Sequence, residues 1–299
     1  MLYDKSRTKE LQPSLFENPS SEYRGAPFWA WNCKLTRELL TEQIEVLKEM
    51  GFGGFHMHPR TGFATTYLSP EHMQLVRACV DKARQEQMYS YLYDEDRWPS
   101  GAAGGLVTKN PGYRQRYLNF TPEAHEMAEH EVLLGCYDIE LDENGCLKKY
   151  KMISAEQAAA GVKWFASLKT MDESPWYNNE TYVDTLNKKA IDQFIQVTYE
   201  TYRESIGEEF GKTAPSIFTD EPQFSWKGTL SYPEEKQTIM LPWTDDLAET
   251  FQETYGENLL ENLPQLFWEL PDGKVSVIRY HYHDHVTERF TEAFADNCG

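Results

Sequence analysis

The sequence predicts an α/β fold organised around a parallel sheet. Strand-like and helical segments alternate three times within residues 25–101, as they do when helices cover the faces of a parallel sheet. The chain has 299 residues, 40% hydrophobic and 14% aromatic, so it can bury a large core as one barrel or as two smaller domains. Carboxylates also follow two of the predicted strands directly, which is where α/β proteins carry their chemistry.

The first two strands flank a clearly marked helix. Residues 25–32 form a short apolar and aromatic run of strand length. Thr36 is placed to cap the helix that follows, and Gly51 supplies a left-handed residue to end it. Residues 53–59 then read as the second strand. The helix should bury one stripe of side chains at helical spacing, formed by Leu40, Ile44 and Leu47.

The third unit repeats this pattern. Ser69 is placed to cap a helix that has Pro70 at its first position. The strand that follows, residues 88–93, cannot continue far, because Pro99 and Gly101 interrupt it. The buried stripe of this helix is Met73, Val76, Val80 and Ala83.

The alternation breaks between residues 102 and 184. Residues 131–139 and 147–153 flank a turn at residues 142–145 and predict a hairpin within an inserted β-rich subdomain. A helix and a fourth strand, residues 214–219, follow the insertion. Helical segments are then expected at about 243–255 and 275–296.

A charged group follows the third strand immediately. Asp94, Glu95 and Asp96 precede Arg97 and Trp98, at the carboxyl end of an aromatic strand. Loops at that end of a barrel can vary without disturbing the interior, so catalytic residues gather there. A solvated loop with incidental salt bridges is the simpler interpretation of an acidic triplet alone.

A second acidic group follows the fourth strand. Asp220 and Glu221 emerge from it, and Pro222 stops the strand at that point. Glycoside hydrolysis commonly uses one carboxyl group that protonates the leaving oxygen and another that activates water or attacks the sugar. Acids at neighbouring strand ends can provide both, although a strand terminus followed by a helix cap would also place acids here.

Aromatic and basic residues at strand ends suggest a sugar site. Trp31 and Trp98 can each cover the apolar face of a pyranose. His58 and Arg60 lie near the end of the second strand, where Arg60 offers a fixed cation. His56 and His58 point to the same side of that strand, so a metal-dependent amidohydrolase-type enzyme is an alternative.

Composition excludes several classes of function. The net charge of -19 argues against nucleic acid and anionic membrane surfaces as partners, since these require clustered Lys and Arg. The five cysteines form no Cys-x-x-Cys pair, so free thiols are expected. Residues 1–6 lack the features of a signal peptide and no run is long enough to span a bilayer, which predicts a cytoplasmic protein.

Four segments together resemble the barrel domain of family 106 glycoside hydrolases, which are α-L-rhamnosidases, and their uncharacterised relatives. These segments are residues 26–32, 51–58, 93–101 and 218–222. The acidic-Arg-Trp-Pro-Ser-Gly motif is the most specific part of a similarity that covers about residues 24–298. The resemblance implies a (β/α)8 TIM-barrel type of fold at the front of a larger protein, an inverting mechanism and a calcium ion near the sugar hydroxyls.

The pattern of elements and the resemblance together divide the chain into four parts. These are an amino-terminal lead (1–24), the first half of a barrel (25–101), the inserted subdomain (102–184) and a barrel continuation with a helical extension (185–299). The barrel is therefore expected to be incomplete, with unpaired strand edges that favour self-association.

The family's site residues carry over onto matching positions. Glu221 takes the place of the glutamate after the fourth strand, as general acid, and the second catalytic carboxylate is expected on a later strand outside this chain. Asp94, Glu95 and Asp96 are implied as calcium ligands. His56 departs from the family's usual apolar residue. The positions around the sugar are Trp31, Asn32, His58, Arg60, Arg97, Trp98 and Asp220.

The sequence thus predicts a glycosidase that acts on a deoxyhexose such as rhamnose by carboxyl acid/base catalysis, without an organic cofactor. A non-catalytic carbohydrate-binding fragment of a larger glycosidase is the main alternative.

Overall fold

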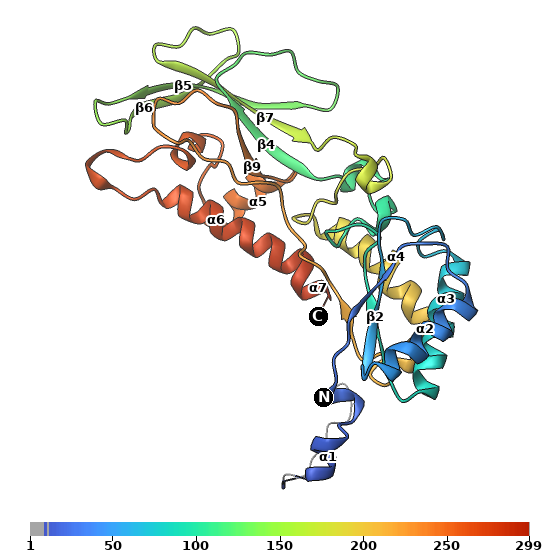
Figure 1. Cartoon of the computed structure of the whole chain (residues 1–299). Helices are drawn as coiled ribbons and strands as arrows, with labels where there is room; N and C mark the ends of the chain where they lie inside the picture. The colour runs from blue at the N-terminus through green and yellow to red at the C-terminus, as the bar shows by residue number, and fades with distance from the viewer. Residues whose placement is uncertain (1–8, 11, 299) are drawn as a thin grey trace. The chain divides into compact units, whose positions relative to one another are not determined.

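The computed structural model describes residues 9, 10 and 12–298 and divides them into two compact units (Figure 1). The first unit extends to Val107 and includes Pro175–Asn179 and Gln193–Pro222. The second unit is made of Thr108–Ser174, Glu180–Asp192 and the chain from Gln223 onward. Residues 1–6, where no signal peptide was expected, lie outside the described residues.

A four-stranded parallel sheet forms the centre of the first unit. Its order is β1 (Phe28–Trp31), β2 (Gly54–Pro59), β3 (Tyr89–Tyr93) and β8 (Ile217–Phe218), and every neighbouring pair is parallel. The prediction of a parallel sheet with four strands is confirmed. The closed barrel implied by the family resemblance is not formed by the described residues, because β1 and β8 remain as open edges of this sheet.

Helices cover one face of the parallel sheet, namely α2 (Arg37–Glu49), α3 (Pro70–Gln85) and α4 (Lys188–Ile206) (Figure 1). Both predicted caps are present, since Thr36 accepts a hydrogen bond from the Leu39 amide and Ser69 accepts one from the His72 amide. The side chains buried between this face and the helices include Trp31, Leu40, Ile44, Phe55, Val76, Val80, Leu92 and Tyr202.

The opposite face of the sheet is lined with rings. Phe28 makes edge contacts with His56 and Phe218, at centroid distances of 4.9 and 5.0 Å. His58 stacks on Tyr93 at 3.7 Å, and Tyr93 stacks on Phe218 at 5.4 Å. Phe28, on the edge strand β1, remains 53% exposed. Alternation along the strands therefore separates an aliphatic and tryptophan-rich helix side from this aromatic face.

An antiparallel sheet of five strands forms the second unit. Its order is β6 (Leu147–Ile153), β5 (Val132–Leu141), β7 (Val162–Thr170), β4 (Arg116–Thr121) and β9 (Ile239–Pro242). The predicted hairpin is confirmed as β5 paired with β6, and Asp142 holds its turn by accepting hydrogen bonds from the amides of Asn144 and Cys146.

Within residues 185–299, predicted as a barrel continuation with a helical extension, only Gln193–Pro222 belong to the first unit. Strand β9 pairs with β4, so the chain after Pro222 joins the antiparallel sheet. Helices α5 (Leu247–Tyr255) and α6 (Val277–Phe290) follow and bury apolar side chains of that unit. The shared core contains Phe120, Tyr137, Trp164, Trp268, Phe251 and Tyr282. The reason is hydrophobic, because this sheet has an apolar face that these helices remove from water.

Two further expectations from the sequence concern membrane spans and cysteines. No helix in the described part of the chain is long and apolar enough to cross a membrane. All five cysteines are free thiols, as expected.

Short elements complete the two units. The remaining elements are α1 (Pro13–Glu17), α7 (Asp296–Cys298), a π-helical turn (Thr291–Ala295) and the 3-10 turns Ser21–Tyr23, Ala103–Gly105, Pro111–Tyr113, Pro175–Tyr177, Gly207–Glu209, Leu263–Leu266 and Pro271–Gly273.

Candidate functional site

The two predicted acidic groups lie on the same edge of the parallel sheet. Strands β3 and β8 are neighbours, with Tyr93 opposite Phe218. The Asp94 amide continues the ladder by donating to the Phe218 carbonyl at 3.2 Å. Residues 94–100 and 219–222 therefore leave adjacent parallel strands at their carboxyl ends, as the sequence predicts. We call these two segments the acidic rim.

The buried Asp94 carboxylate links the two segments of the acidic rim through hydrogen bonds. Its carboxylate is fully buried and accepts hydrogen bonds from the hydroxyls of Ser100, Thr219 (2.6 Å) and Tyr199 (2.9 Å). Burial raises the pKa of Asp94 to about 6, although the three hydroxyl donors oppose that rise. Because these donors come from three separate segments, Asp94 fixes the geometry of the site and is closed to a ligand.

Asp220 is held by the same network. The Ser100 amide donates to the Asp220 carbonyl at 3.0 Å, and the Asp220 amide donates to the Ser100 hydroxyl at 2.8 Å. The Tyr93 hydroxyl donates to the Asp220 carboxylate. Asp220 is half-buried. The hydrogen bond from Tyr93 restrains its carboxylate, and the residue remains partly accessible to solvent.

Glu95 differs from its neighbours because its carboxyl group is buried without a polar partner. The side chain is 1% exposed, and neither oxygen makes a hydrogen bond with a described residue. The His58 imidazole is 3.9 Å away. Burial is the main cause that raises the pKa of Glu95 to about 9, and the charges of Asp220 and Asp94 add to it.

Asp96 faces a third direction. It pairs with Arg97 at 2.9 Å and accepts a hydrogen bond from the Asn178 amide at 3.1 Å. One guanidinium nitrogen of Arg97, a residue predicted to contact the sugar, donates to both the carboxylate and the carbonyl of Asp96.

The three consecutive carboxylates do not fit a calcium ion. The Asp94 carboxylate accepts hydrogen bonds from hydroxyls. Asp96 pairs with Arg97 and accepts a hydrogen bond from Asn178, whereas Glu95 lies near His58. Across the described residues, no group of three or more His, Cys, Asp or Glu side chains is arranged to hold a metal ion. Calcium needs oxygens that converge on one point, and these three carboxylates are not arranged in that way, so the calcium role of Asp94, Glu95 and Asp96 stays a prediction. The same finding gives no support to the zinc enzyme suggested by His56 and His58.

Glu221 and Trp98 form an exposed pair at the rim. The Trp98 indole N–H donates to the Glu221 carboxylate at 3.2 Å, and both side chains are exposed. Glu221 has a φ of 42°, in the left-handed region that non-glycine residues rarely occupy. The Trp98–Pro99 peptide bond is cis. The carboxylate of Glu221 and the broad ring of Trp98 thus lie side by side.

His58 and Arg60 lie beside the rim at the end of β2. Burial lowers the pKa of His58 to about 4, and the nearby Arg60 charge acts in the same direction. The imidazole is therefore neutral at physiological pH, stacked on Tyr93 and 3.5 Å from the Arg60 guanidinium. His56, farther from the strand end, stacks on Tyr91 instead.

Two predicted sugar contacts lie in or directly after the edge strand β1. Trp31 is fully buried between the sheet and its helices, so its role as a sugar platform is wrong. Trp31 and Trp29 lie on the same side of β1. Trp31 is buried because the helices cover that side of the sheet. Asn32 is exposed directly after β1, and its contact with a sugar stays a prediction.

Several site residues were missed from the sequence. Tyr93 stands inside the predicted motif, and its alternation with Tyr91 could have indicated that it faces His58. Tyr199 and Asn178 offered no signal, because they reach Asp94 and Asp96 from 105 and 82 residues away along the chain. Long-range packing brings them to the site.

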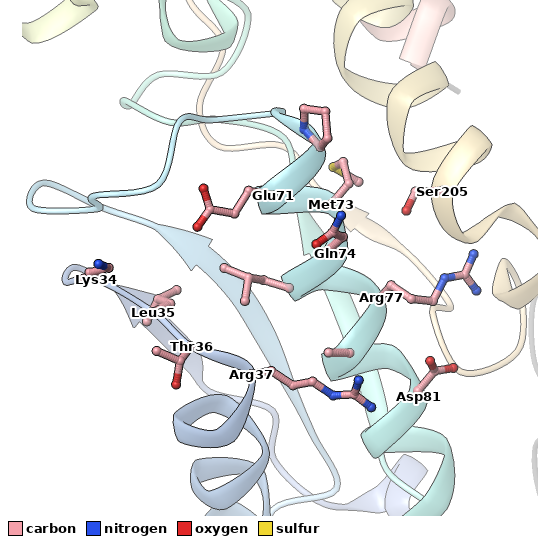
Figure 2. A pocket seen from close by; sticks show the side chains of 13 residues that line it. Lys34, Leu35, Thr36, Arg37, Glu71, Met73, Gln74, Arg77, Asp81 and Ser205 are labelled. Atoms are coloured by element: carbon pink, nitrogen blue, oxygen red, sulfur yellow. The ribbon is translucent and has the colours of Figure 1, made fainter.

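A separate hollow of about 710 Å³ opens on the helix side of the first unit (Figure 2). Its walls come from the segment that leads into α2, from α3 as far as Asp81 and from Ser205 on α4. They mix the cations Lys34, Arg37 and Arg77 with Glu71 and Asp81. It shares no residue with the acidic rim.

A parallel sheet with an acidic rim, together with a separate antiparallel sheet, makes this a mixed α/β protein. A similar solved structure is that of the rhamnosidase from Novosphingobium sp. PP1Y, with a TM-score of 0.57 and 11% sequence identity. The match covers 95% of this chain and 45% of that chain, so this chain spans less than half of the rhamnosidase. At this identity the likeness concerns the fold alone. No protein-family model and no curated protein sequence matches.

Proposed function

We propose that this chain is a glycoside hydrolase, or the carboxyl-bearing part of one, that acts on a deoxyhexoside such as an α-L-rhamnoside. The substrate would lie on the acidic rim, with Glu221 as one of two catalytic carboxyl groups. The family resemblance of the motifs and the fold similarity to a rhamnosidase both favour this class. Because fold alone does not define function, the argument depends on the residues of the rim.

The pair of Trp98 and Glu221 is the observation that carries the proposal. A sugar that rests on an exposed indole face would have its ring edge beside the carboxylate to which that indole donates. Glycoside hydrolysis needs a carboxyl group within reach of the glycosidic oxygen or of an attacking water. Arg60, half-buried beside neutral His58, supplies donors for sugar hydroxyls.

The direct test is to replace Glu221 with Gln. Gln keeps an oxygen that can accept from Trp98 but cannot exchange a proton, so hydrolysis of 4-nitrophenyl α-L-rhamnoside should fall by at least about a hundredfold. Glu49→Gln is a matched control, because Glu49 is exposed at the end of α2 and distant in sequence from the rim. Equal turnover by Glu221→Gln and the wild type would refute the proposal.

A second candidate is a carbohydrate-binding part that lacks chemistry. The open edges of the parallel sheet favour it, as does the coverage of 45% of the rhamnosidase chain. Calorimetric titration with L-rhamnose, run beside the hydrolysis assay, distinguishes the two functions. Binding without turnover selects the second candidate, and turnover selects the first.

A further inference from the structure

A second exposed indole lies against the acidic rim. Trp176 belongs to the short segment Pro175–Asn179, which is part of the first unit. Its indole N–H donates to the Trp98 carbonyl at 2.6 Å, across 78 residues of sequence. Trp176 is 40% exposed, close to the 37% of Trp98 itself. The rim thus carries a second indole that no local sequence pattern indicated.

The polar edges of both rings are already engaged. Trp98 donates its N–H to Glu221 at 3.2 Å, and Trp176 donates its N–H to the Trp98 backbone. An indole has this one hydrogen-bond donor and no acceptor. Both residues therefore present hydrocarbon and aromatic surface to solvent. The negative face of such a ring attracts the weakly positive C–H groups of a pyranose.

Asn178 adds a hydrogen-bond acceptor to the same segment. Its amide nitrogen donates to the Asp96 carboxylate at 3.1 Å and to the Gly104 carbonyl at 2.8 Å, which uses both of its N–H groups. Because both N–H groups are bonded, the orientation of the amide oxygen is fixed as well. Asn178 is exposed, and its amide oxygen accepts no hydrogen bond from a described residue. This oxygen can accept a hydrogen bond from a sugar hydroxyl.

The segment Pro175–Asn179 is positioned before any ligand arrives. Trp176 and Asn178 are both bonded to residues of the rim or of the loop that follows it. Tyr177, between them, is half-buried, whereas its two neighbours are exposed. A ring that is held in place in this way loses little conformational freedom when a ligand binds to it.

We propose that Trp176 is a second sugar platform next to Trp98, and that the substrate is therefore a glycan of two or more sugar units. The inference rests on the proposed hydrolase function and deepens it. The deoxyhexose would lie on Trp98 beside Glu221, and the next sugar of the chain would lie on Trp176, with a hydroxyl that donates to Asn178. Trp176 is in this view a specificity-determining residue, because it selects the chain that binds and does not touch the reacting atoms.

A sugar suits this surface better than other ligands that stack on indoles. A flat aromatic aglycone would gain from the ring of Trp176 alone, whereas a sugar can also use the amide oxygen of Asn178. Nucleotides and single-stranded nucleic acids stack on aromatic rings too, but they require a positively charged surface. The net charge of -19 disfavours such polyanions.

The experiment measures binding to the full chain by calorimetry. The ligands are L-rhamnose, the S-linked rhamnosyl-rhamnose disaccharides of each linkage, and the thio-rhamnoside of 4-nitrophenol. Sulfur replaces the glycosidic oxygen in these ligands, so that they are not hydrolysed during the titration.

Two variants separate the ring of Trp176 from its hydrogen bond. Trp176→Ala removes both, and Trp176→Phe keeps a ring but loses the bond to the Trp98 carbonyl. Trp226→Ala is a matched control, because it removes an indole that is 78% exposed and belongs to the second unit. Circular dichroism verifies that each variant is folded.

Wild type should bind at least one of the disaccharides about two- to tenfold more tightly than L-rhamnose, the range expected for one aromatic contact. Trp176→Ala should remove this gain and leave the affinity for L-rhamnose unchanged. Trp176→Phe should retain most of the gain, because an aromatic face remains. Trp226→Ala should match the wild type with every ligand.

Four results would overturn the proposal: a wild type without a gain for any disaccharide, a gain that Trp176→Ala retains, equal losses in Trp176→Phe and Trp176→Ala, or a loss confined to the nitrophenyl ligand. Equal losses would assign the effect to the bond with Trp98, and the last result would assign the ring to an aromatic aglycone.

Hydrolysis of 4-nitrophenyl α-L-rhamnoside by wild type and Glu221→Gln tests the proposed function separately. A disaccharide gain that depends on Trp176, without hydrolysis, refutes the hydrolase and supports the second platform. Hydrolysis that depends on Glu221, without a disaccharide gain, supports the hydrolase and refutes the platform. A wild type that binds none of these ligands refutes both.

Discussion

The burial of Glu95 should make the free energy of unfolding depend on pH. The variant Glu95→Gln, which cannot ionise, removes this dependence. The folded protein raises the pKa of this group from an ordinary value of 4.5 to about 9. Between these values the unfolded chain has released the proton and the folded chain retains it. Stability contributed by the neutral acid is therefore complete below about pH 4.5 and is lost as the pH rises towards 9.

The magnitude follows from the size of the shift. Each pKa unit corresponds to about 1.4 kcal/mol, so wild type should lose about 3 kcal/mol relative to Glu95→Gln by pH 7 and about 6 kcal/mol by pH 9. Gln remains neutral at every pH and, since Glu95 has no hydrogen-bond partner among the described residues, it removes no contact of that kind. The variant should therefore be the more stable protein at pH 7.

Urea unfolding at pH 4.5, 7 and 9 measures this difference. The second unit is identical in both proteins, so a change in the gap between their unfolding free energies with pH belongs to residue 95. Glu49→Gln serves as the control and should parallel the wild type. Curves for Glu95→Gln and wild type that stay parallel, or a variant less stable at pH 7, would show that Glu95 is ionised or paired in the folded protein.

Three further predictions concern the rim and the sheet. Ser100→Ala removes a donor to the buried Asp94 carboxylate and should lower the unfolding free energy by about 1.5–3 kcal/mol in urea titrations; an unchanged midpoint contradicts the network. Trp98→Ala should weaken L-rhamnose binding about two- to tenfold by calorimetry, and unaltered affinity would exclude the ring as a platform. Phe28→Ser should reduce any self-association seen by sedimentation, since Phe28 is the exposed ring of an open edge strand; equal association would point to another surface.

Local signals in the sequence were sufficient for the strands and helices of the first unit and for the location of the rim, but strands β4, β7 and β9 were not predicted. Thr36, Ser69 and Gly51 mark helix ends that the structure contains. Pro99 and Pro222 limited the strands, so both acidic groups could be placed at carboxyl ends before the strands were known to be neighbours.

The failures concern directions and partners, which local signals do not determine. Trp31 has the right position at a strand end, but alternation alone does not say which face the helices cover. Asp94, Glu95 and Asp96 follow the strand in a loop, where consecutive side chains have no fixed periodicity. The pairing of β9 with β4 joins residues more than a hundred positions apart, and no local pattern announces it.

The buried carboxylate of Asp94 also has a consequence for synthesis. Its acceptor bonds to Tyr199 and Thr219 span 105 and 125 residues, and about half of the second unit is encoded between the two ends of each bond. A nascent chain that has released β1, β2 and β3 therefore cannot bury Asp94 with all of its hydrogen-bond partners until translation has passed position 219. Much of the second unit is therefore synthesised before the first unit can fold completely. Because the segments of the two units alternate along the chain, no single truncation point separates them.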